Sequence, residues 1–283
     1  MAARLALKDQ LFTREKVERV ADEIARAHPG FAAAAFATAV LARFPHLELK
    51  ARISWMATCL ADHLPDDFRT AGGILIRSLP APVDPALSDG DFGDFIYAPH
   101  AEYLARHGCT SEDLAFSLAG LREITTRFSA EFAIRPLLDA FPERVLGTLR
   151  EWTDDEHYHV RRLCSEGTRP RLPWARNLTL PPDTGLPLLD RLFTDSTRYV
   201  TRSVANHVND FSRKDPDLAL GTLERWWESG RQHPREMAYV IRHAARTLLR
   251  AEHPRALRLV EASLAGVRGR GGGRTRAMQE GTV

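Results

Sequence analysis

The sequence predicts an all-α fold, a right-handed solenoid of antiparallel helix pairs, and three observations support this prediction. A valine recurs with a spacing of forty residues, at Val160, Val200 and Val240. Apolar residues along most of the chain recur at the three- and four-residue spacing of amphipathic helices. No segment shows the sustained period-two alternation, bounded by turn residues, that predicts a β-strand.

The forty-residue register defines the predicted repeat. An arginine stands two residues after each valine, at Arg162, Arg202 and Arg242. The spacing matches the ~40–47-residue period of HEAT-type repeats, in which one unit is a pair of antiparallel helices. We therefore expect the three arginines on corresponding helices of successive repeats, forming a row along one concave face.

The chain before these repeats is expected to form further helices, the first of them starting at Thr13. Residues 80–98 interrupt the pattern with three prolines, two glycines and four aspartates, which predicts an irregular excursion over one face of the fold. The expected helices span residues 13–28, 31–44, 46–63, 65–79, 98–107 and 111–126.

Domain organisation and charge follow from composition. Residues 1–265 are expected to form one helical-repeat domain, and the glycine- and arginine-rich residues 266–283 a disordered tail. Residues 1–156 contain 17 Lys and Arg against 24 Asp and Glu, whereas residues 157–283 contain 22 against 13. This asymmetry predicts a polyanionic partner for the C-terminal half.

The composition also indicates a cytoplasmic globular protein, expected to be a monomer without a membrane partner. Hydrophobic residues make up 44% of the 283 residues and charged residues 27%, and no apolar run approaches the ~18 residues of a membrane helix. The N-terminus lacks the apolar core of a signal peptide. Cys59, Cys109 and Cys164 are expected to be buried free thiols in a reducing compartment.

The segment from His159 to Trp174 is the densest motif of the chain. Its first part continues an amphipathic helix, which Gly167 is expected to end in the left-handed conformation. Two later prolines predict a stiff loop over residues 168–174.

One carboxylate, Glu166, therefore lies at a helix end beside Arg162, Arg169 and Arg171. A surface salt-bridge cluster and a functional site both fit this pattern. A carboxylate repels phosphates, so its place among basic residues suggests that positive charge develops on the ligand. Breaking a glycosidic bond produces such charge in an oxocarbenium-like transition state, which a carboxylate stabilises.

A second motif spans residues 129–136 and contains Glu131 in an apolar surround, followed by Arg135. A carboxylate in such a setting must be paired, be hydrogen-bonded or have a raised pKa. The alternative is a carboxylate that the dipole of a helix start stabilises.

Other kinds of site have little support, so we expect no metal and no cofactor. His157, His159 and Cys164 have no second cluster at the spacing of zinc ligands, and no base is placed beside Cys164 to activate it as a nucleophile. Glycine-rich phosphate-binding loops are absent from the sequence. Trp174 could lie against a sugar or a cationic base.

Three segments resemble the AlkC branch of the AlkC/AlkD DNA-alkylation-repair glycosylases: residues 129–136, residues 160–174 and Arg202–Asp210 (Arg-Ser-Val-Ala-Asn-His-Val-Asn-Asp). The Ser-Glu-Gly-Thr-Arg-Pro-Arg-Leu-Pro-Trp block is the most specific of them, and the similarity covers about residues 10–262. The resemblance implies a bacterial HEAT-like enzyme of base excision repair. Such an enzyme removes 3-methyladenine, and in the AlkC branch 3-methylcytosine, from duplex DNA without flipping the base.

The resemblance also implies roles for residues. Glu131 and Glu166 correspond to the catalytic pair and Trp174 to an aromatic residue near the deoxyribose. Some relatives continue into an immunoglobulin-like domain, whereas this chain ends in the glycine- and arginine-rich tail, so the grip on DNA is expected to differ. The predicted DNA-binding residues are Arg135, Arg162, Arg169, Arg171, Arg202, Asn206, Arg242, His243 and Arg246.

The leading hypothesis is thus a monofunctional DNA-3-methyladenine glycosylase acting on alkylated duplex DNA. The alternatives are a non-catalytic HEAT-like DNA-binding protein, which would need the arginine row but not both acids, and a protein-interaction solenoid. A protein-interaction solenoid would give no reason for an arginine that recurs every forty residues.

Overall fold

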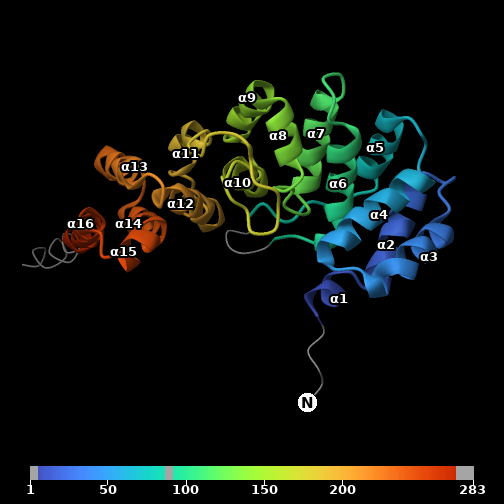
Figure 1. Cartoon of the computed structure of the whole chain (residues 1–283), viewed down its shortest axis with the longest axis horizontal. Helices are drawn as coiled ribbons and strands as arrows, with labels where there is room; N and C mark the ends of the chain where they lie inside the picture. Colours follow the sequence, from blue (N-terminus) through green and yellow to red (C-terminus); the bar gives the residue numbers. More distant parts are fainter. Residues whose placement is uncertain (1–5, 87–91, 272–283) are drawn as a thin grey trace, which may run out of the picture. The chain divides into compact units, whose positions relative to one another are not determined.

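The computed structural model describes residues 6–86 and 92–271, and in these ranges it contains helices and no strand. The predicted all-α fold of packed helix pairs is confirmed. The chain forms two compact units, Met1–Glu151 and Trp152–Val283, and Figure 1 labels the helices of each in chain order. None of the helices in the described part combines the length and apolar character needed to cross a bilayer.

Unit 1 contains each of the six helices expected in it. Thr13 and Asp67 cap two of them, because their side chains accept hydrogen bonds from the backbone N–H groups of Lys16 and Thr70. Helix α2 packs on α3 and α5, and α6 packs on α4 and α7. The helices are α1 Leu7–Leu11, α2 Arg14–Ala27, α3 Ala33–Arg43, η1 Phe44–His46, α4 Leu49–His63, α5 Phe68–Arg77, η2 Phe95–Tyr97, α6 Ala98–His107, α7 Leu114–Thr125, α8 Ile134–Ala140 and α9 Pro142–Trp152.

The excursion after α5 is held against the end of α7. The backbone N–H of Val83 donates to the carbonyl of Thr126 at 2.9 Å, and that of Asp94 donates to the carbonyl of Arg127 at 2.9 Å. Gly93 has φ +75°, and a Cβ atom there would lie 1.8 Å from the Arg127 carbonyl oxygen. Glycine is therefore required at this close approach of two backbones.

Unit 2 is a succession of helices in which α10, α12, α14 and α16 pack one on the next, while α11 packs on α10 and α12 and α13 packs on α12 and α16. The helices are α10 Tyr158–Glu166, α11 Leu186–Leu192, α12 Arg198–Ser212, α13 Pro216–Ser229, α14 Pro234–Ala244, α15 Arg246–Arg250 and α16 Pro254–Gly271. Because α16 extends to Gly271, residues 266–271 are helical and do not belong to the predicted tail. The rest of that tail, 272–283, lies outside the described residues.

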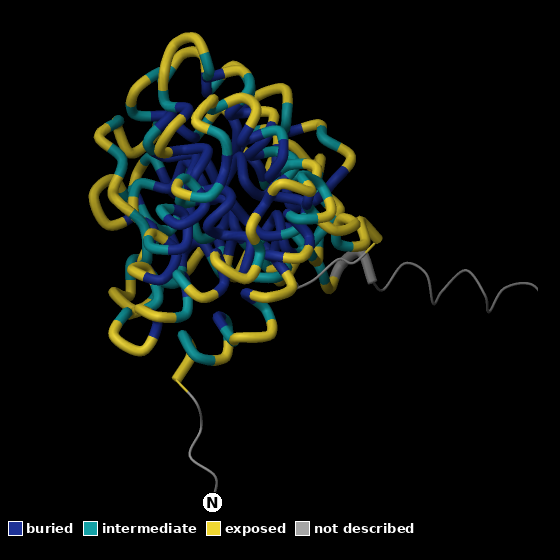
Figure 2. Tube along the Cα trace, turned by 90° about the vertical axis from the view of Figure 1, so that its right-hand side faces the viewer, coloured by how far each residue is buried: buried dark blue, intermediate teal, exposed yellow. Residues whose placement is uncertain are grey.

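The forty-residue register places one valine on each of three helices that pack one on the next. The three valines of the repeat lie on α10, α12 and α14, and none of them has exposed surface. The arginine that follows each valine is progressively more exposed: Arg162 is buried, Arg202 is half-buried and Arg242 is exposed. Figure 2 colours the described residues by burial and shows exposed stretches alternating with buried ones along the chain.

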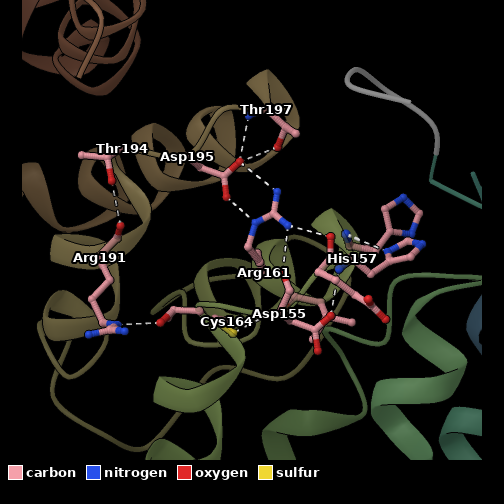
Figure 3. A network of polar contacts seen from close by, with 12 residues as sticks. Asp155, His157, Arg161, Cys164, Arg191, Thr194, Asp195 and Thr197 are labelled. Atoms are coloured by element: carbon pink, nitrogen blue, oxygen red, sulfur yellow. Dashed lines mark hydrogen bonds and ion pairs between the residues drawn. The ribbon is translucent and has the colours of Figure 1, made fainter. Parts of the chain in front are cut away.

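A partly buried ion pair fixes the start of α10 against the turn before α12 (Figure 3). The Arg161 guanidinium donates from Nε to Asp195 Oδ2 at 2.6 Å and from Nη1 to the carbonyls of Asp155 and Glu156 at 2.8 and 3.0 Å. Asp195 Oδ1 also accepts from the backbone N–H and the hydroxyl of Thr197, each at 2.8 Å. The Asp195 side chain is only 4% exposed, so its charge depends on Arg161.

Removing this partner should destabilise the fold. We expect Arg161→Met to lower the free energy of unfolding by about 3 kcal/mol, because Asp195 would be left as a buried charge without its guanidinium. The matched control is Arg225→Met, which breaks the exposed pair between Arg225 and Asp190 and should cost less than about 1 kcal/mol. Chemical unfolding followed by circular dichroism measures both values, and equal losses would contradict this role of Arg161.

Candidate active site

Glu166 is the last residue of α10 and is buried, with 4% of its surface exposed. The helix ends where the sequence predicted, but the expected left-handed glycine is wrong, since Gly167 has φ −65° and ψ −29°. The helix end is capped by a side chain instead. The Thr168 hydroxyl donates to the carbonyl of Cys164 at 2.7 Å, which satisfies a carbonyl that the helix leaves open.

Both oxygens of the Glu166 carboxylate are engaged by polar groups. Arg169 Nη1 donates to Oε1 at 2.5 Å, and the hydroxyl of Ser203, on α12, donates to Oε2 at 2.6 Å. Arg162, one turn earlier on α10, places Nη2 3.5 Å from Oε2. The Arg162 guanidinium also lies over the Tyr199 ring, with Cζ 4.6 Å from the centroid. The carboxylate thus has a fixed orientation before any ligand binds.

Asp210 completes the charge balance of this cluster. Arg169 donates from Nε to Asp210 Oδ2 at 2.7 Å and from Nη2 to Oδ1 at 3.1 Å, a bidentate pair. Two carboxylates, Glu166 and Asp210, are therefore matched by two guanidinium groups, those of Arg162 and Arg169. Ser203 and Asp210 were not among the predicted site residues, although both lie in the Arg202–Asp210 segment that carries the family resemblance.

The cluster keeps Glu166 ionised. Burial raises the pKa of Glu166, but Arg162 and Arg169, together with the Ser203 hydrogen bond, outweigh burial, and the net pKa lies below the ordinary glutamate value. The pKa of Asp210 shifts the other way, because burial there exceeds the effect of Arg169. Glu166 is therefore a stable anion at neutral pH and a weak proton acceptor.

A second group of predicted DNA-binding residues lies between α12 and α14. His243 Nε2 and Asn206 Oδ1 are 2.9 Å apart, and Arg246 Nη1 donates to the His243 carbonyl at 2.6 Å. Burial, together with Arg246, Arg202 and Arg198, lowers the pKa of His243 to about 4, so this imidazole is neutral at pH 7. Arg202, Asn206, His243 and Arg246 therefore form one neighbourhood of half-buried side chains.

The remaining residues predicted in unit 2 differ in exposure. Arg171 and Arg242 are exposed, and no ion pair to either is found in the part of the chain that the structure describes. Trp174 is half-buried in the loop between α10 and α11. All three could therefore be reached by a ligand bound to unit 2.

Glu131 and Arg135 belong to unit 1. Glu131 is 4% exposed and lies in the turn before α8, and Arg135 lies in α8 itself. Arg135 has no exposed surface, so its predicted contact with DNA is corrected: a guanidinium that solvent cannot reach cannot bond to a phosphate. The prediction that Glu131 and Glu166 act together stays a prediction.

Neither metal binding nor thiol chemistry has structural support in unit 2. No group of three or more His, Cys, Asp and Glu side chains placed to hold a metal ion occurs in residues 6–86 and 92–271. His157 and His159 instead pack against Tyr158, with ring centroids 5.3 and 4.5 Å from its ring. Burial raises the pKa of the Cys164 thiol well above its usual value, which makes it unreactive.

Comparisons with known proteins point to one family. No family model matches the chain. The chain is 32% identical over 254 residues to the uncharacterized protein YhaZ of Bacillus subtilis strain 168, covering 88% of this chain and 67% of that protein. It is also similar to a solved structure of the alkylpurine DNA glycosylase AlkC of Pseudomonas fluorescens, bound to DNA that contains an abasic-site analogue. That match has 33% identity and a TM-score of 0.77, over 92% of this chain and 68% of that one.

The hydrogen bond from Ser203 should contribute to the low pKa of Glu166. In Ser203→Ala the ionised carboxylate loses a donor, so we expect the pKa of Glu166 to rise. A folded-state pKa below the ordinary value stabilises the fold above that ordinary value, about 4.3, and this stability is lost as the pH falls through the folded-state pKa. In the variant, the folded-state pKa lies closer to the ordinary value, so the loss of stability should be smaller and should be complete at a higher pH.

Carboxyl ¹³C NMR titration of Glu166 and pH-dependent unfolding measure these two effects. The control is Ser196→Ala, which removes an exposed hydroxyl. Identical titration midpoints for Glu166 in the wild type and Ser203→Ala would show that the hydrogen bond has no influence on its charge.

Proposed function

The chain belongs to the AlkC family of DNA glycosylases, and we propose that it excises cationic N3-alkylated bases from duplex DNA. The substrates are 3-methyladenine and, as a second lesion, 3-methylcytosine. The enzyme acts as a monofunctional glycosylase and as a monomer, without metal or cofactor, and it leaves an abasic site for base excision repair. A carboxylate held ionised among arginines, Glu166, is the observation that supports this proposal.

Cleavage of the bond to a cationic base needs a negatively charged group in the active site but does not need a group that donates a proton. Alkylation at N3 makes the base cationic, so the base departs without being protonated by the enzyme. The remaining barrier is the positive charge that develops on the deoxyribose, together with the delivery of water to the anomeric carbon. A fixed carboxylate lowers the free energy of that charged transition state.

Glu166 is suited to the electrostatic part of this task. Its lowered pKa keeps it charged, and the contacts to Arg169 and Ser203 hold it in one orientation. The same low basicity makes Glu166 a poor acceptor for a proton from water. We therefore propose that Glu166 stabilises the oxocarbenium-like sugar and that Glu131 orients or deprotonates the attacking water.

The arginines then fall into two groups. Arg162 and Arg169 are buried and bonded to Glu166, so they position the carboxylate. Arg171, Arg202 and Arg242 are more accessible and suit contacts to DNA phosphates. Asn206, His243 and Arg246 extend the DNA-binding surface, and Trp174 lies against the deoxyribose.

Loss of either carboxylate should slow base release without preventing DNA binding. We expect Glu131→Gln to reduce the single-turnover rate by about 10²–10⁴-fold, the range for loss of a general base. Glu166→Gln should reduce it by about 10²–10³-fold, the range for loss of one electrostatic interaction. The measurement is release of 3-methyladenine from methylated duplex DNA, followed by chromatography.

The control for both variants is Glu228→Gln, which changes an exposed carboxylate on α13. Circular dichroism and duplex affinity show whether each variant is folded and binds. If folded Glu131→Gln and Glu166→Gln both released the base at the wild-type rate, the proposed roles of these carboxylates would be wrong.

The nature of the leaving group gives an independent test. Neutral bases need a proton before they leave, and the ionised Glu166 cannot donate one. We expect no release of uracil from a uracil-containing duplex under conditions in which 3-methyladenine is released. Uracil release at a comparable rate would contradict the mechanism, whichever residues prove to be essential.

A further inference from the structure

Unit 2 contains a cavity of about 380 Å³ whose lining includes Asp210, the carboxylate that pairs with Arg169. Its lining comes from the loop after α10 and from the end of α12, and it includes Asp210, Leu178 and Leu180. The volume lies within the range of small-molecule sites. Asp210 lines the cavity and bonds Arg169, which also bonds Glu166, so the cavity is connected to Glu166 through these two side chains.

Three cations that line this cavity have no carboxylate partner among the residues that the structure describes. Arg171, Arg213 and Lys214 line it and are exposed, and within the described ranges no ion pair to any of them is found. Other surface arginines of unit 2 do have partners, as Arg225 has Asp190 and Arg255 has Glu224. The cavity therefore presents positive charge that no carboxylate in the described ranges pairs with.

The remaining lining restricts what kind of anion fits. Leu178, Leu180 and Phe211 give the cavity an apolar wall, which a small inorganic anion would leave uncovered. Asp210 adds little repulsion, because both of its oxygens accept hydrogen bonds from Arg169. The lining matches a ligand that has a negatively charged end and an apolar body.

We propose that this cavity holds one phosphodiester of the bound DNA strand. The phosphate lies among Arg171, Arg213 and Lys214, and the attached deoxyribose lies against the apolar wall. This inference rests on the proposed function and specifies how the enzyme places its substrate. A phosphate fixed in the cavity sets the register of the strand relative to Glu166, so the carboxylate faces one sugar and not its neighbours.

The test is a double-mutant cycle between the protein and single phosphates of the DNA. A duplex with an abasic-site analogue is made in versions that each carry one uncharged methylphosphonate near that analogue. Affinity is measured for the wild type and for the double variant Arg213→Gln/Lys214→Gln. The matched control is Arg235→Gln/Arg258→Gln, which removes the same charge from exposed positions that do not line the cavity.

We expect one phosphate position at which the methylphosphonate weakens wild-type binding by about tenfold, the effect of removing one charge-assisted hydrogen bond. The same methylphosphonate should hardly change the affinity of Arg213→Gln/Lys214→Gln for the duplex. It should weaken binding by the control variant as much as it weakens binding by the wild type. The salt dependence of duplex binding should become shallower by about one unit of slope for each phosphate that the variant no longer neutralises. Leu180→Trp, which fills the cavity and keeps its charges, should weaken binding to the unmodified duplex.

Additive effects at every phosphate, or undiminished binding by folded Leu180→Trp, would overturn the inference, because the cations would then attract DNA only diffusely. Base release by the wild type separates this failure from failure of the proposed function. If the wild type releases 3-methyladenine but the cycle shows no coupling between the cations and any phosphate, the glycosylase function stands and the phosphodiester site is rejected. If the cycle shows coupling but the wild type releases no base, the phosphodiester site stands and the proposed glycosylase function is rejected.

Discussion

The burial of one carboxylate, Glu166, is the constraint on which the arrangement of unit 2 depends. An ionised group with 4% exposure is tolerated only when its charge is paired and its oxygens are hydrogen-bonded. The partners come from α10, from the loop after it and from α12. Keeping them within hydrogen-bonding distance fixes these elements against one another, as the Arg161–Asp195 pair does at the other end of α10.

The same constraint explains the chemistry that we propose for Glu166. Pairing with two guanidinium groups lowers its pKa and removes most of its basicity, while leaving a charge that does not need to reorganise during the reaction. A cationic leaving group needs no acid, so a site built around an anion of this kind is sufficient for bond breaking. The task of accepting a proton from water then falls to a different residue, for which Glu131 is our candidate.

The positive charge of the C-terminal half serves two purposes. Many of its arginines are used within the protein, where they neutralise carboxylates at helix contacts, as Arg169 does with Asp210 and Arg255 with Glu224. Other basic residues, among them Arg171, Arg213 and Lys214, remain exposed and have no carboxylate partner among the described residues. An excess of arginine in the sequence is therefore not in itself a DNA-binding surface, because the tertiary contacts decide which guanidinium groups stay available.

The sequence by itself determined the features that depend on neighbours along the chain. Helical periodicity, the caps at Thr13 and Asp67 and the forty-residue register are local, and so is the spacing that puts Arg162 and Arg169 within one turn of Glu166. The tertiary structure alone decided what depends on distant segments: the hydrogen bond of Ser203 and the pairing of Asp210 join residues 37 and 41 positions apart. It also decided that Arg135 is buried, since a sequence motif shows which residues adjoin an arginine but not which helices cover it.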